Sequence, residues 1–234
     1  MILALIPAYD EAGSIAKVIE ETSKYVDEVV VIDDGSKDKT SEIANCFGAT
    51  VLRHSRNMGV GAAMRTGIEY AKKVRPSVVV TIDGDGQHDP KEIPRIVQPI
   101  ISRQADFVLG SRFFQHGKLN MPLIKLVGNK LLSLFISVLL GVRITDVQTG
   151  FRALDWEALM ALNLEADHTY VQEMIIELCL KGYKLKEIPT KVKPRKHGNS
   201  KVTSNIFKYI TKTLPSIFRA YACNYQKLMI RNCK

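Results

Sequence analysis

The sequence predicts an α/β protein whose mostly parallel sheet is flanked by helices. Short apolar runs of strand length alternate with segments of helical periodicity through the first half of the chain. One run, EVVVID at residues 28–33, is continuous and β-branched, as in a strand that is covered on both faces. Polar clusters follow several of the expected strands. Repeated strand–helix–strand units of this kind form parallel sheets, because each helix returns the chain to the end of the sheet at which the previous strand began.

The expected elements follow along the chain in order. A first strand over residues 2–6 ends at Pro7, and a helix over residues 14–25 has Ile15, Val18 and Ile19 on one side. Further strands are expected over residues 28–33, 50–53, 78–82 and 106–111. Helices between them are expected over residues 40–47, 61–73 and 90 to about 102. The clusters PAYDE, DDGS and DGDGQ follow strand carboxyl ends, where sheets of this kind bind their ligands.

Two apolar segments in the second half fit more than one structure. Residues 122–142 are interrupted by Lys125, Asn129 and Lys130, and the charge-free part, residues 131–142, is shorter than the roughly 20 residues that span a bilayer. Residues 205–225 mix aromatic, aliphatic and cationic side chains, and Pro215 is expected to kink them. Both segments fit core helices and also helices that lie in a membrane interface. For residues 205–225 we favour the interface.

Length and composition are those of one globular domain. The chain has 234 residues, of which 46% are hydrophobic and 24% charged. Its four cysteines are scattered without C-x-x-C spacing, so neither a zinc site nor a disulfide framework is expected, and a reducing cytoplasm is the simplest setting. Met1 leads directly into an apolar run without a basic region or a cleavage site, so that run is expected to be a strand and not a signal peptide.

The net charge of +9 is unevenly distributed. Residues 184–234 contain 13 Lys and Arg against a single acid, Glu187, whereas residues 1–183 carry a net charge of −3. A basic tail of this kind can bind nucleic acid, anionic lipid headgroups or a phosphorylated substrate. The plain alternative is a solvated basic surface without a partner.

The stretch VVVTIDGDGQHDP, residues 78–90, leads an expected buried strand into three carboxylates. Because like charges repel at close range, we expect a cation among them. Asp83, Asp85 and Gln87 occupy alternate positions, so an extended backbone would point their oxygens in one direction, and the glycines between them leave room for a ligand. Oxygen ligands suit Mg²⁺ or Mn²⁺. We expect such a cation to hold the diphosphate of a sugar nucleotide.

Competing motifs fit less well. A calcium-binding EF-hand loop starting at Asp83 would need glycine and glutamate where the chain has His88 and Pro94. The G-x-G at residues 59–61 lacks the third glycine of a dinucleotide site, because Met64 stands there, and no P-loop sequence occurs. A purely structural turn rich in Asp and Gly is the remaining alternative to a metal site.

Seven segments carry a resemblance to a known family. They are IPAYDEAGSI, VVVIDDGSKDKT, RNMGVGAAMRTGI, DGDGQHDP, GSRF, DVQTGFRAL and PRKHGNSKV, in this order, and they cover residues 2–202. Together they resemble the inverting nucleotide-sugar transferases of GT-A fold, and within these the polyprenyl-phosphate glycosyltransferases typified by dolichol-phosphate mannose synthase. The resemblance implies a mostly parallel GT-A sheet, and we expect amphipathic interface helices in the C-terminal part.

The resemblance also implies roles for individual positions. Five positions match those that hold the nucleoside: Pro7, Tyr9, Glu11, Ile32 and Asp34. Four match the site of the metal and the diphosphate: Asp83, Gly84, Asp85 and Gln87, with Asp85 and Gln87 as direct ligands of Mg²⁺ or Mn²⁺. Arg112 matches an arginine that faces the donor and acceptor phosphates, and Arg195 and Lys201 match a loop that closes over the diphosphate.

The expected chemistry needs positive charge more than a base. A departing nucleoside diphosphate is stabilised by a cation together with Arg and Lys, and a lipid phosphate is already an anionic nucleophile near neutral pH. Asp146 is a candidate for orienting that nucleophile, or else a structural loop residue. Glu173 lies where hydroxyl-acceptor relatives place their base, and it equally fits a residue that orients Arg195. Lys125 and Asn129 stand in the acceptor helix, where no matching Arg and Ser pair is found.

The sequence thus predicts a single-domain glycosyltransferase over residues 1–234, with a nucleotide-sugar and metal half (1–112), an acceptor half (113–202) and a basic amphipathic segment (203–234). It is expected to transfer a hexose from GDP-mannose, UDP-glucose or UDP-N-acetylglucosamine to a polyprenyl (dolichyl) phosphate with inversion. We expect a peripheral protein on the cytoplasmic face of the cell membrane, alone or with a membrane-embedded partner subunit, and no nucleic acid partner.

Two other functions stay open at this point. A transferase of the same fold that adds sugar to a glycan hydroxyl, for a surface polysaccharide, would need a true base such as Asp146 or Glu173. A non-catalytic nucleotide or nucleic-acid binding protein is suggested by the basic tail alone. The acidic cluster at residues 83–89 argues against this second alternative, because pure binding gains little from it.

Overall fold

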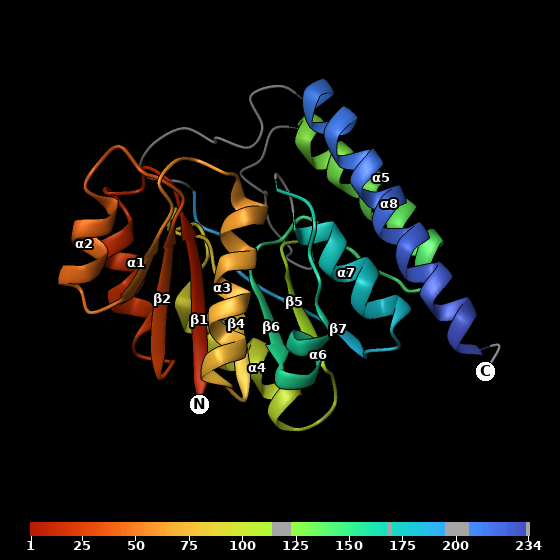
Figure 1. The fold of residues 1–234 in the computed structure, drawn as a ribbon, viewed down its shortest axis with the longest axis horizontal. Helices are drawn as coiled ribbons and strands as arrows, with labels where there is room; N and C mark the ends of the chain where they lie inside the picture. The colour runs from red at the N-terminus through yellow and green to blue at the C-terminus, as the bar shows by residue number, and fades with distance from the viewer. Residues whose placement is uncertain (114–122, 168–169, 195–205, 233–234) are drawn as a thin grey trace.

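The fold is a seven-stranded mixed sheet with helices on both faces (Figure 1). The computed structural model describes residues 1–113, 123–167, 170–194 and 206–232, and side chains are described up to residue 226 except in 206–212. Within these residues the strands are β1 (Ile2–Ala8), β2 (Glu28–Asp33), β3 (Thr50–Arg53), β4 (Val78–Thr81), β5 (Phe107–Ser111), β6 (Arg152–Asp155) and β7 (Leu185–Pro189). They lie in the order β3-β2-β1-β4-β6-β5-β7.

The sheet is parallel apart from one strand. β1 pairs in parallel with β2 and β4, β2 with β3, and β5 with β7. β6 is inserted between β4 and β5 and runs antiparallel to both. The beginning of β6 therefore lies beside the carboxyl ends of β4 and β5, and Arg152 is the register partner of both Thr81 and Leu109. The predicted α/β class is confirmed, whereas the sequence did not predict β6 or β7.

Two helical layers cover the sheet. α1 (Ile15–Thr22), α2 (Thr40–Cys46) and α4 (Ile93–Ile101), which follows a 3₁₀ turn at Pro90–Glu92, share one apolar core. The other core is shared by α3 (Val60–Val74), α6 (Trp156–Ala161), α7 (Val171–Leu180) and parts of α5 (Leu123–Leu140) and α8 (Ile206–Asn232). Alternate residues of β1 enter the two cores: Leu3 and Leu5 one, Ala4 and Ile6 the other. β6 and β7 join the first five strands in one sheet.

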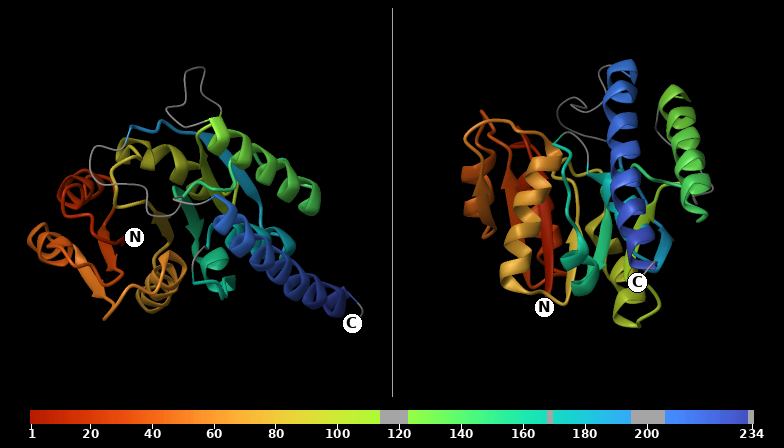
Figure 2. Two further views of the ribbon diagram at one scale, coloured as in Figure 1. Left: turned by 90° about the horizontal axis from the view of Figure 1, so that it is seen from above. Right: turned by 45° about the vertical axis from the view of Figure 1, so that its right-hand side comes forward.

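The two long helices α5 and α8 lie next to each other beyond the β7 edge (Figures 1 and 2). The rings of Phe135 and Phe218 meet edge to face with centroids 6.0 Å apart. α8 is one continuous helix through Pro215, and it buries Ile217 and Ala220 in the core beside α7. One side of the described part of α8 therefore packs in the core and the other side is exposed. The larger exposed apolar surface belongs to α5.

By length and composition, α5 is one helix among the described residues that could cross a membrane. Its 18 residues have a mean hydropathy of 1.9, and 17% of them are buried. A core helix of a soluble protein meets the same length and hydropathy, but a core helix is mostly buried.

Candidate functional site

Three polar segments meet at the carboxyl edge of the parallel strands. The backbone N–H of Asp34, after β2, donates to the carbonyl of Ala8 in β1 at 2.8 Å. The hydroxyl of Ser14 donates to the carbonyl of Gly84, after β4, at 2.8 Å. A Cβ atom at Gly84 would lie 3.3 Å from the carbonyl oxygen of Pro7, so a glycine lets these two segments approach closely. The predicted nucleoside and metal segments are therefore neighbours.

The residues matched to the nucleoside site differ in what their side chains do. The side chain of Ile32 is fully buried in the core, so it supports the site from below. The Asp34 carboxylate accepts hydrogen bonds from the backbone N–H of Met58 and Gly59, each at 2.8 Å, and lies 2.8 Å from Nδ1 of His54. Asp34 thereby holds the loop that precedes α3. Pro7, Tyr9 and Glu11 lie at the carboxyl end of β1 and directly after it, at the edge where a nucleotide would lie.

Asp83 begins the predicted metal motif, residues 83–87, and lies against Gly150 in the turn before β6. Its carboxylate is 3.4 Å from Nε2 of the buried His88, and its side chain is 39% exposed. Burial acts to raise the pKa of Asp83, but the nearby His88, Arg112 and Arg152 outweigh burial and hold the pKa below its ordinary value. Asp83 is therefore an anion at neutral pH, as a ligand of a metal cation must be.

The metal motif offers oxygen donors without a closed cage. The Oδ1 atom of Asp85 accepts the backbone N–H of Gln87 at 3.0 Å, a local turn that fixes the motif. Within the described ranges, no three His, Cys, Asp or Glu side chains are grouped as a metal site. Two carboxylates and an amide oxygen suit Mg²⁺ or Mn²⁺, which take their remaining ligands from phosphate and water. The predicted donor set, Asp83, Asp85 and Gln87, thus fits that class of ion.

Gly150 leaves the space that Asp83 occupies. A Cβ atom at Gly150 would lie 2.6 Å from both carboxylate oxygens of Asp83. The hydroxyl of Thr81 donates to the carbonyl of Gly150 at 2.6 Å and ties the end of β4 to this turn. The segment QTGFR is thus packed against the metal motif, and its glycine is required by close approach.

Arg112 and Asp146 form a two-pronged ion pair. Nε and Nη2 of Arg112 donate to the two Asp146 oxygens at 2.6 and 2.7 Å, and the Arg112 backbone N–H adds a third bond at 3.1 Å. The amide of Asn129, from α5, donates to Oδ1 of Asp146 at 3.0 Å. Asp146 is fully buried. Burial acts to raise its pKa, but pairing with Arg112 and the bond from Asn129 lower it below the ordinary value.

This geometry gives Asp146 a supporting role. A carboxylate with a lowered pKa that accepts from Arg112 and Asn129 is poorly suited to take a proton from a substrate. It holds the guanidinium group in one orientation next to the metal motif. Asp146, named from the sequence as a catalytic candidate, is thus placed as the residue that positions Arg112.

Arg152 is a buried cation behind the site that the sequence analysis missed. It is fully buried and donates to the carbonyls of Thr149, Val147 and Val171 at 2.9, 3.2 and 2.7 Å. Its guanidinium lies 5.8 Å from the ring centroid of Tyr170. Burial lowers the pKa of Arg152 to about 10, so it remains charged at neutral pH and favours the anionic forms of the two nearby aspartates.

Glu187 is a second residue that the sequence analysis did not single out. Its carboxylate accepts the backbone N–H of Thr145 at 2.9 Å and that of Asp146 at 3.1 Å. It thereby fixes the turn that carries Asp146. A signal was present in the sequence, because Glu187 is the single acid among residues 184–234.

After β7, and just before the segment of Arg195 and Lys201, the chain runs alongside the metal motif. Val192 forms an antiparallel bridge with His88, and the backbone N–H of Lys193 donates to the carbonyl of Gln87 at 2.8 Å. The ammonium of Lys193 pairs with Asp89 at 2.9 Å. Arg195 and Lys201 themselves lie outside the described residues. Their predicted roles stay predictions.

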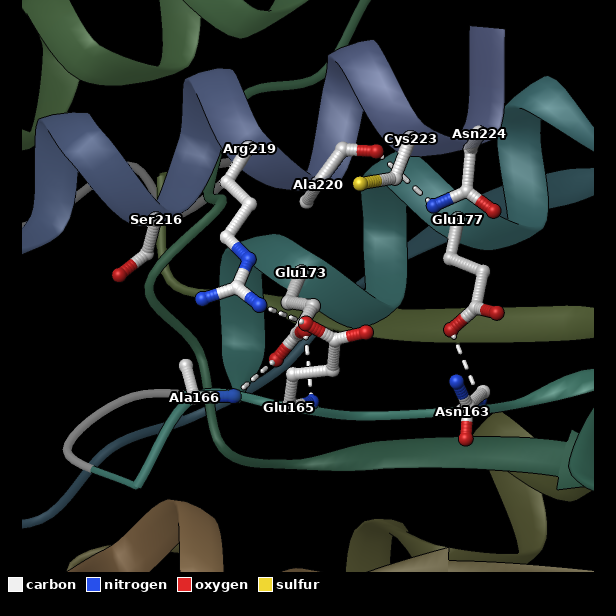
Figure 3. A pocket seen from close by; sticks show the side chains of 10 residues that line it. All are labelled: Asn163, Glu165, Ala166, Glu173, Glu177, Ser216, Arg219, Ala220, Cys223 and Asn224. Carbon is white, nitrogen blue, oxygen red and sulfur yellow. Dashed lines mark hydrogen bonds and ion pairs between the residues drawn. The ribbon is translucent and has the colours of Figure 1, made fainter. Parts of the chain in front are cut away.

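Glu173 lies in a different place, at a cavity of about 80 Å³ between α7, α8 and residues 163–166 (Figure 3). Its two oxygens accept the backbone N–H groups of Glu165 and Ala166 at 2.8 and 3.1 Å. Burial raises its pKa. Arg219 of α8 pairs with Glu165 at 3.0 Å and closes one side of the cavity. Glu173 therefore anchors the loop before α7, and its hydrogen bonds engage that loop and not the metal motif.

Comparison with known proteins agrees with this geometry. A sequence model described as Glycosyl transferase family 2 matches residues 4–157. The chain is 36% identical over 182 residues to the UDP-N-acetylglucosamine–dolichyl-phosphate N-acetylglucosaminyltransferase of Methanococcus voltae, covering 70% of this chain and 72% of the relative. It is 30% identical over 217 residues to the undecaprenyl-phosphate mannosyltransferase of Micrococcus luteus, covering 88% of each.

Solved structures share the fold. Glucosyl-3-phosphoglycerate synthase from Mycobacterium tuberculosis, crystallised with Mn²⁺, UDP and glucosyl-3-phosphoglycerate, superposes with a TM-score of 0.72. The match covers 93% of this chain and 80% of that chain at 21% identity, so it concerns the fold. The family match and the relatives confirm the predicted resemblance and enzyme class. The chain belongs to glycosyl transferase family 2 and is a glycosyltransferase of GT-A fold.

Proposed function

We propose that this enzyme transfers a hexose from a nucleoside diphosphate sugar to a polyprenyl phosphate, with inversion and with the help of a divalent cation. The ion pair between Arg112 and Asp146 is the observation that carries this proposal. It presents a fixed guanidinium whose positive charge acts on Asp83 of the metal motif, where a second phosphate could bind. The names of the Methanococcus and Micrococcus relatives, which contain dolichyl and undecaprenyl phosphate, support the same acceptor class.

Both candidate bases, Asp146 and Glu173, already accept hydrogen bonds from other protein groups, which favours a phosphate acceptor over a sugar hydroxyl. A hydroxyl nucleophile needs a base within hydrogen-bond reach, whereas a phosphate monoester is already an anion. Asp146 is bound to Arg112, and Glu173 is bound to the backbone of its own loop. Neither carboxylate is placed as a free base, which supports the lipid phosphate as the nucleophile.

The residues of this chain would divide the work. Asp83, Asp85 and Gln87 would hold Mg²⁺ or Mn²⁺, which neutralises charge on the departing diphosphate. Arg112 would bind the acceptor phosphate and orient it toward the sugar, because a planar guanidinium recognises phosphate with two parallel bonds. Asp146 and Asn129 keep that guanidinium in place. Arg152 supplies a permanent positive charge beneath the aspartates.

A transfer assay with a donor panel tests this proposal. Labelled GDP-mannose, UDP-glucose and UDP-N-acetylglucosamine would each be offered with Mn²⁺ or Mg²⁺ and either a polyprenyl phosphate or the free polyprenol. Label should partition into organic solvent with one donor and with the phosphate only. NMR of the product should show the inverted anomeric configuration.

The control is Asp85→Ala, which removes a predicted metal ligand. If label moved only to a water-soluble glycan acceptor, the hydroxyl-acceptor alternative would replace the proposal. If no donor gave transfer to any acceptor while the protein still bound nucleotide, the proposal would be wrong and a non-catalytic nucleotide-binding protein would be favoured.

We further propose that the enzyme works at a membrane surface, as a peripheral protein on the cytoplasmic face. A polyprenyl phosphate resides in a bilayer, so its phosphate is reached at the headgroup level. The basic segment after Lys184 supports this location through attraction to anionic lipid. Fractionation of cells into soluble and membrane parts, with a salt wash of the membranes, tests it.

A further inference from the structure

α5 is apolar on both sides: it buries Ile136 in the core and also exposes large apolar side chains on the opposite side. A surface helix of a soluble domain normally points its apolar stripe to the core. On α5 the polar residues Asn129 and Ser133 are buried, 1% and 3% exposed. Six large apolar side chains, here called the α5 outer face, are each more than half exposed: Leu123, Ile124, Val127, Leu131, Leu134 and Val138. An apolar surface of this size on one helix indicates a partner.

The inner side of α5, from Asn129 to Ser137, is hydrogen-bonded to residues 144–147, which follow the helix. Asn129 donates to Asp146, and the hydroxyl of Ser133 accepts the backbone N–H of Val147 at 3.2 Å. One turn further on, the hydroxyl of Ser137 accepts the backbone N–H of Ile144 at 2.9 Å and donates to its carbonyl at 3.0 Å. Because these bonds hold α5 against the domain, its outer face is the side that a membrane surface could contact.

The charges around the outer face select a lipid surface as its occupant. Residues 123–145 contain Lys125, Lys130 and Arg143 and no acid, and residues 206–232 of α8 contain five Lys and Arg and no acid. Phe218 of α8, 55% exposed, contacts Phe135 and extends the apolar surface. On α5 itself, an apolar face among cations with no carboxylate matches acyl chains beneath anionic headgroups, whereas Arg219 of α8 pairs with Glu165. A protein partner would more often meet charges of both signs.

We propose that the α5 outer face docks in the plane of an anionic bilayer, and that the same helix sets the position of Arg112 relative to the lipid phosphates. The link is short: Asn129 on the inner side binds Asp146, and Asp146 binds Arg112. Docking of α5 therefore places the guanidinium at a fixed height above the membrane. This inference rests on the proposed function in one respect, that the acceptor is a lipid phosphate.

Vesicle co-sedimentation of the full chain tests the docking. The variant carries Leu131→Glu and Leu134→Glu, at side chains 61% and 62% exposed. The matched control is Ile101→Glu on α4, which is 60% exposed and lies outside α5. With vesicles containing about 30% phosphatidylglycerol we expect the double variant to lose binding about tenfold and the control to bind like the wild type. Equal binding of the double variant and the wild type would overturn the proposal.

A second copy of the chain is the other occupant that the experiment distinguishes. If the outer face were a dimer interface, the wild type would elute as a dimer without lipid and the double variant as a monomer. Vesicle binding would then be the same for both, which overturns the docking. Matched thermal unfolding of the three proteins verifies that the substitutions, all at exposed positions, leave the fold intact.

Transfer assays separate failure of the docking from failure of the proposed function. With a short, water-soluble polyprenyl phosphate the double variant should turn over like the wild type. With a vesicle-embedded acceptor its rate should fall in parallel with its binding. If neither protein transferred sugar to any lipid phosphate while the double variant still lost vesicle binding, the docking would stand and the proposed function would fall.

Asn129→Ala tests the link to Arg112. This variant keeps the outer face, so vesicle binding should be that of the wild type. Turnover should fall about tenfold at an unchanged KM for the donor, because the Arg112–Asp146 pair loses its anchor on α5. A wild-type rate in Asn129→Ala would overturn the positioning role of α5.

Discussion

The substitution Gly150→Ala probes whether the metal motif depends on the turn before β6. A Cβ atom there would lie 2.6 Å from both oxygens of Asp83 and 2.9 Å from its Cγ, whereas ordinary contact begins at 3.4 Å. The backbone of Gly150 is not among the positive-φ glycines, so alanine can adopt its conformation. The clash must therefore be relieved by movement of the Asp83 carboxylate.

The size of the effect follows from the overlap. The carboxylate must retreat by about 0.8 Å to reach ordinary contact distance. A displacement of about 1 Å at a catalytic group can lower the rate about 10²-fold, or roughly 2.7 kcal/mol in the activation free energy. Global stability should change little, because replacing glycine at an unstrained position contributes about 0.4–1 kcal/mol in favour of folding. We expect a folded enzyme with impaired metal use.

The assay is turnover as a function of Mn²⁺ concentration, together with thermal unfolding with and without Mn²⁺ and donor. The Gly150→Ala enzyme should need more Mn²⁺ for half-maximal rate, and Mn²⁺ should raise its Tm less than that of the wild type. Gly128→Ala is the control, because a Cβ atom at this α5 position meets nothing within 4 Å. That variant should keep wild-type turnover and gain up to about 1 kcal/mol in helix stability.

One outcome would refute the reasoning. If Gly150→Ala retained the wild-type rate and Mn²⁺ dependence, Asp83 would not need its present position for catalysis. The assignment of the 83–87 motif as the metal site would then lose its structural support.

Three further predictions concern the charged groups of the site. Chelation by EDTA and the substitution Asp85→Ala should each abolish turnover without unfolding the protein, and added Mn²⁺ should rescue only the chelated wild type. Arg152→Met should lower the free energy of unfolding in urea by about 3 kcal/mol, because three buried carbonyls lose their donor; an unchanged midpoint would contradict this. Burial acts to raise the pKa of Asp146, but Arg112 holds it below its ordinary 3.8. Its ionised form therefore stabilises the fold above pH 3.8, and that contribution is lost as pH falls through the lowered pKa. Acid unfolding of Asp146→Asn should lack this part of the pH dependence.

Much of the first half of the fold is determined by local sequence. The strands Glu28–Asp33 and Thr50–Arg53 have the predicted bounds, and the helix with Ile15, Val18 and Ile19 buries these residues as its periodicity predicts. These predictions succeed because the pattern of burial repeats every two or 3.6 residues within a single element. The site edge was predictable for the same reason, since parallel strands bring their carboxyl ends together.

The order of strands in the second half depends on contacts that no local pattern contains. β6 pairs with β4 although about 70 residues separate Thr81 from Arg152 in the chain. Its antiparallel insertion brings Gly150 against Asp83 and buries Arg152 behind the site. A short strand with few residues has little periodicity of its own, so its place follows from the neighbours it fits.

The sequence by itself determined which candidate groups lie at the ends of the strands and after them: carboxylates after β4, an arginine after β5 and a basic tail. Only the tertiary structure decided which of them are engaged. Asp146 and Glu173 look alike as candidate bases, but partners from distant segments bind both. Likewise, hydropathy places α5 among core or membrane helices, and only its packing shows that Asn129 faces inward while Leu131 and Leu134 face outward. A side chain's role depends on what lies within a few ångströms of it, and that is a property of the folded chain.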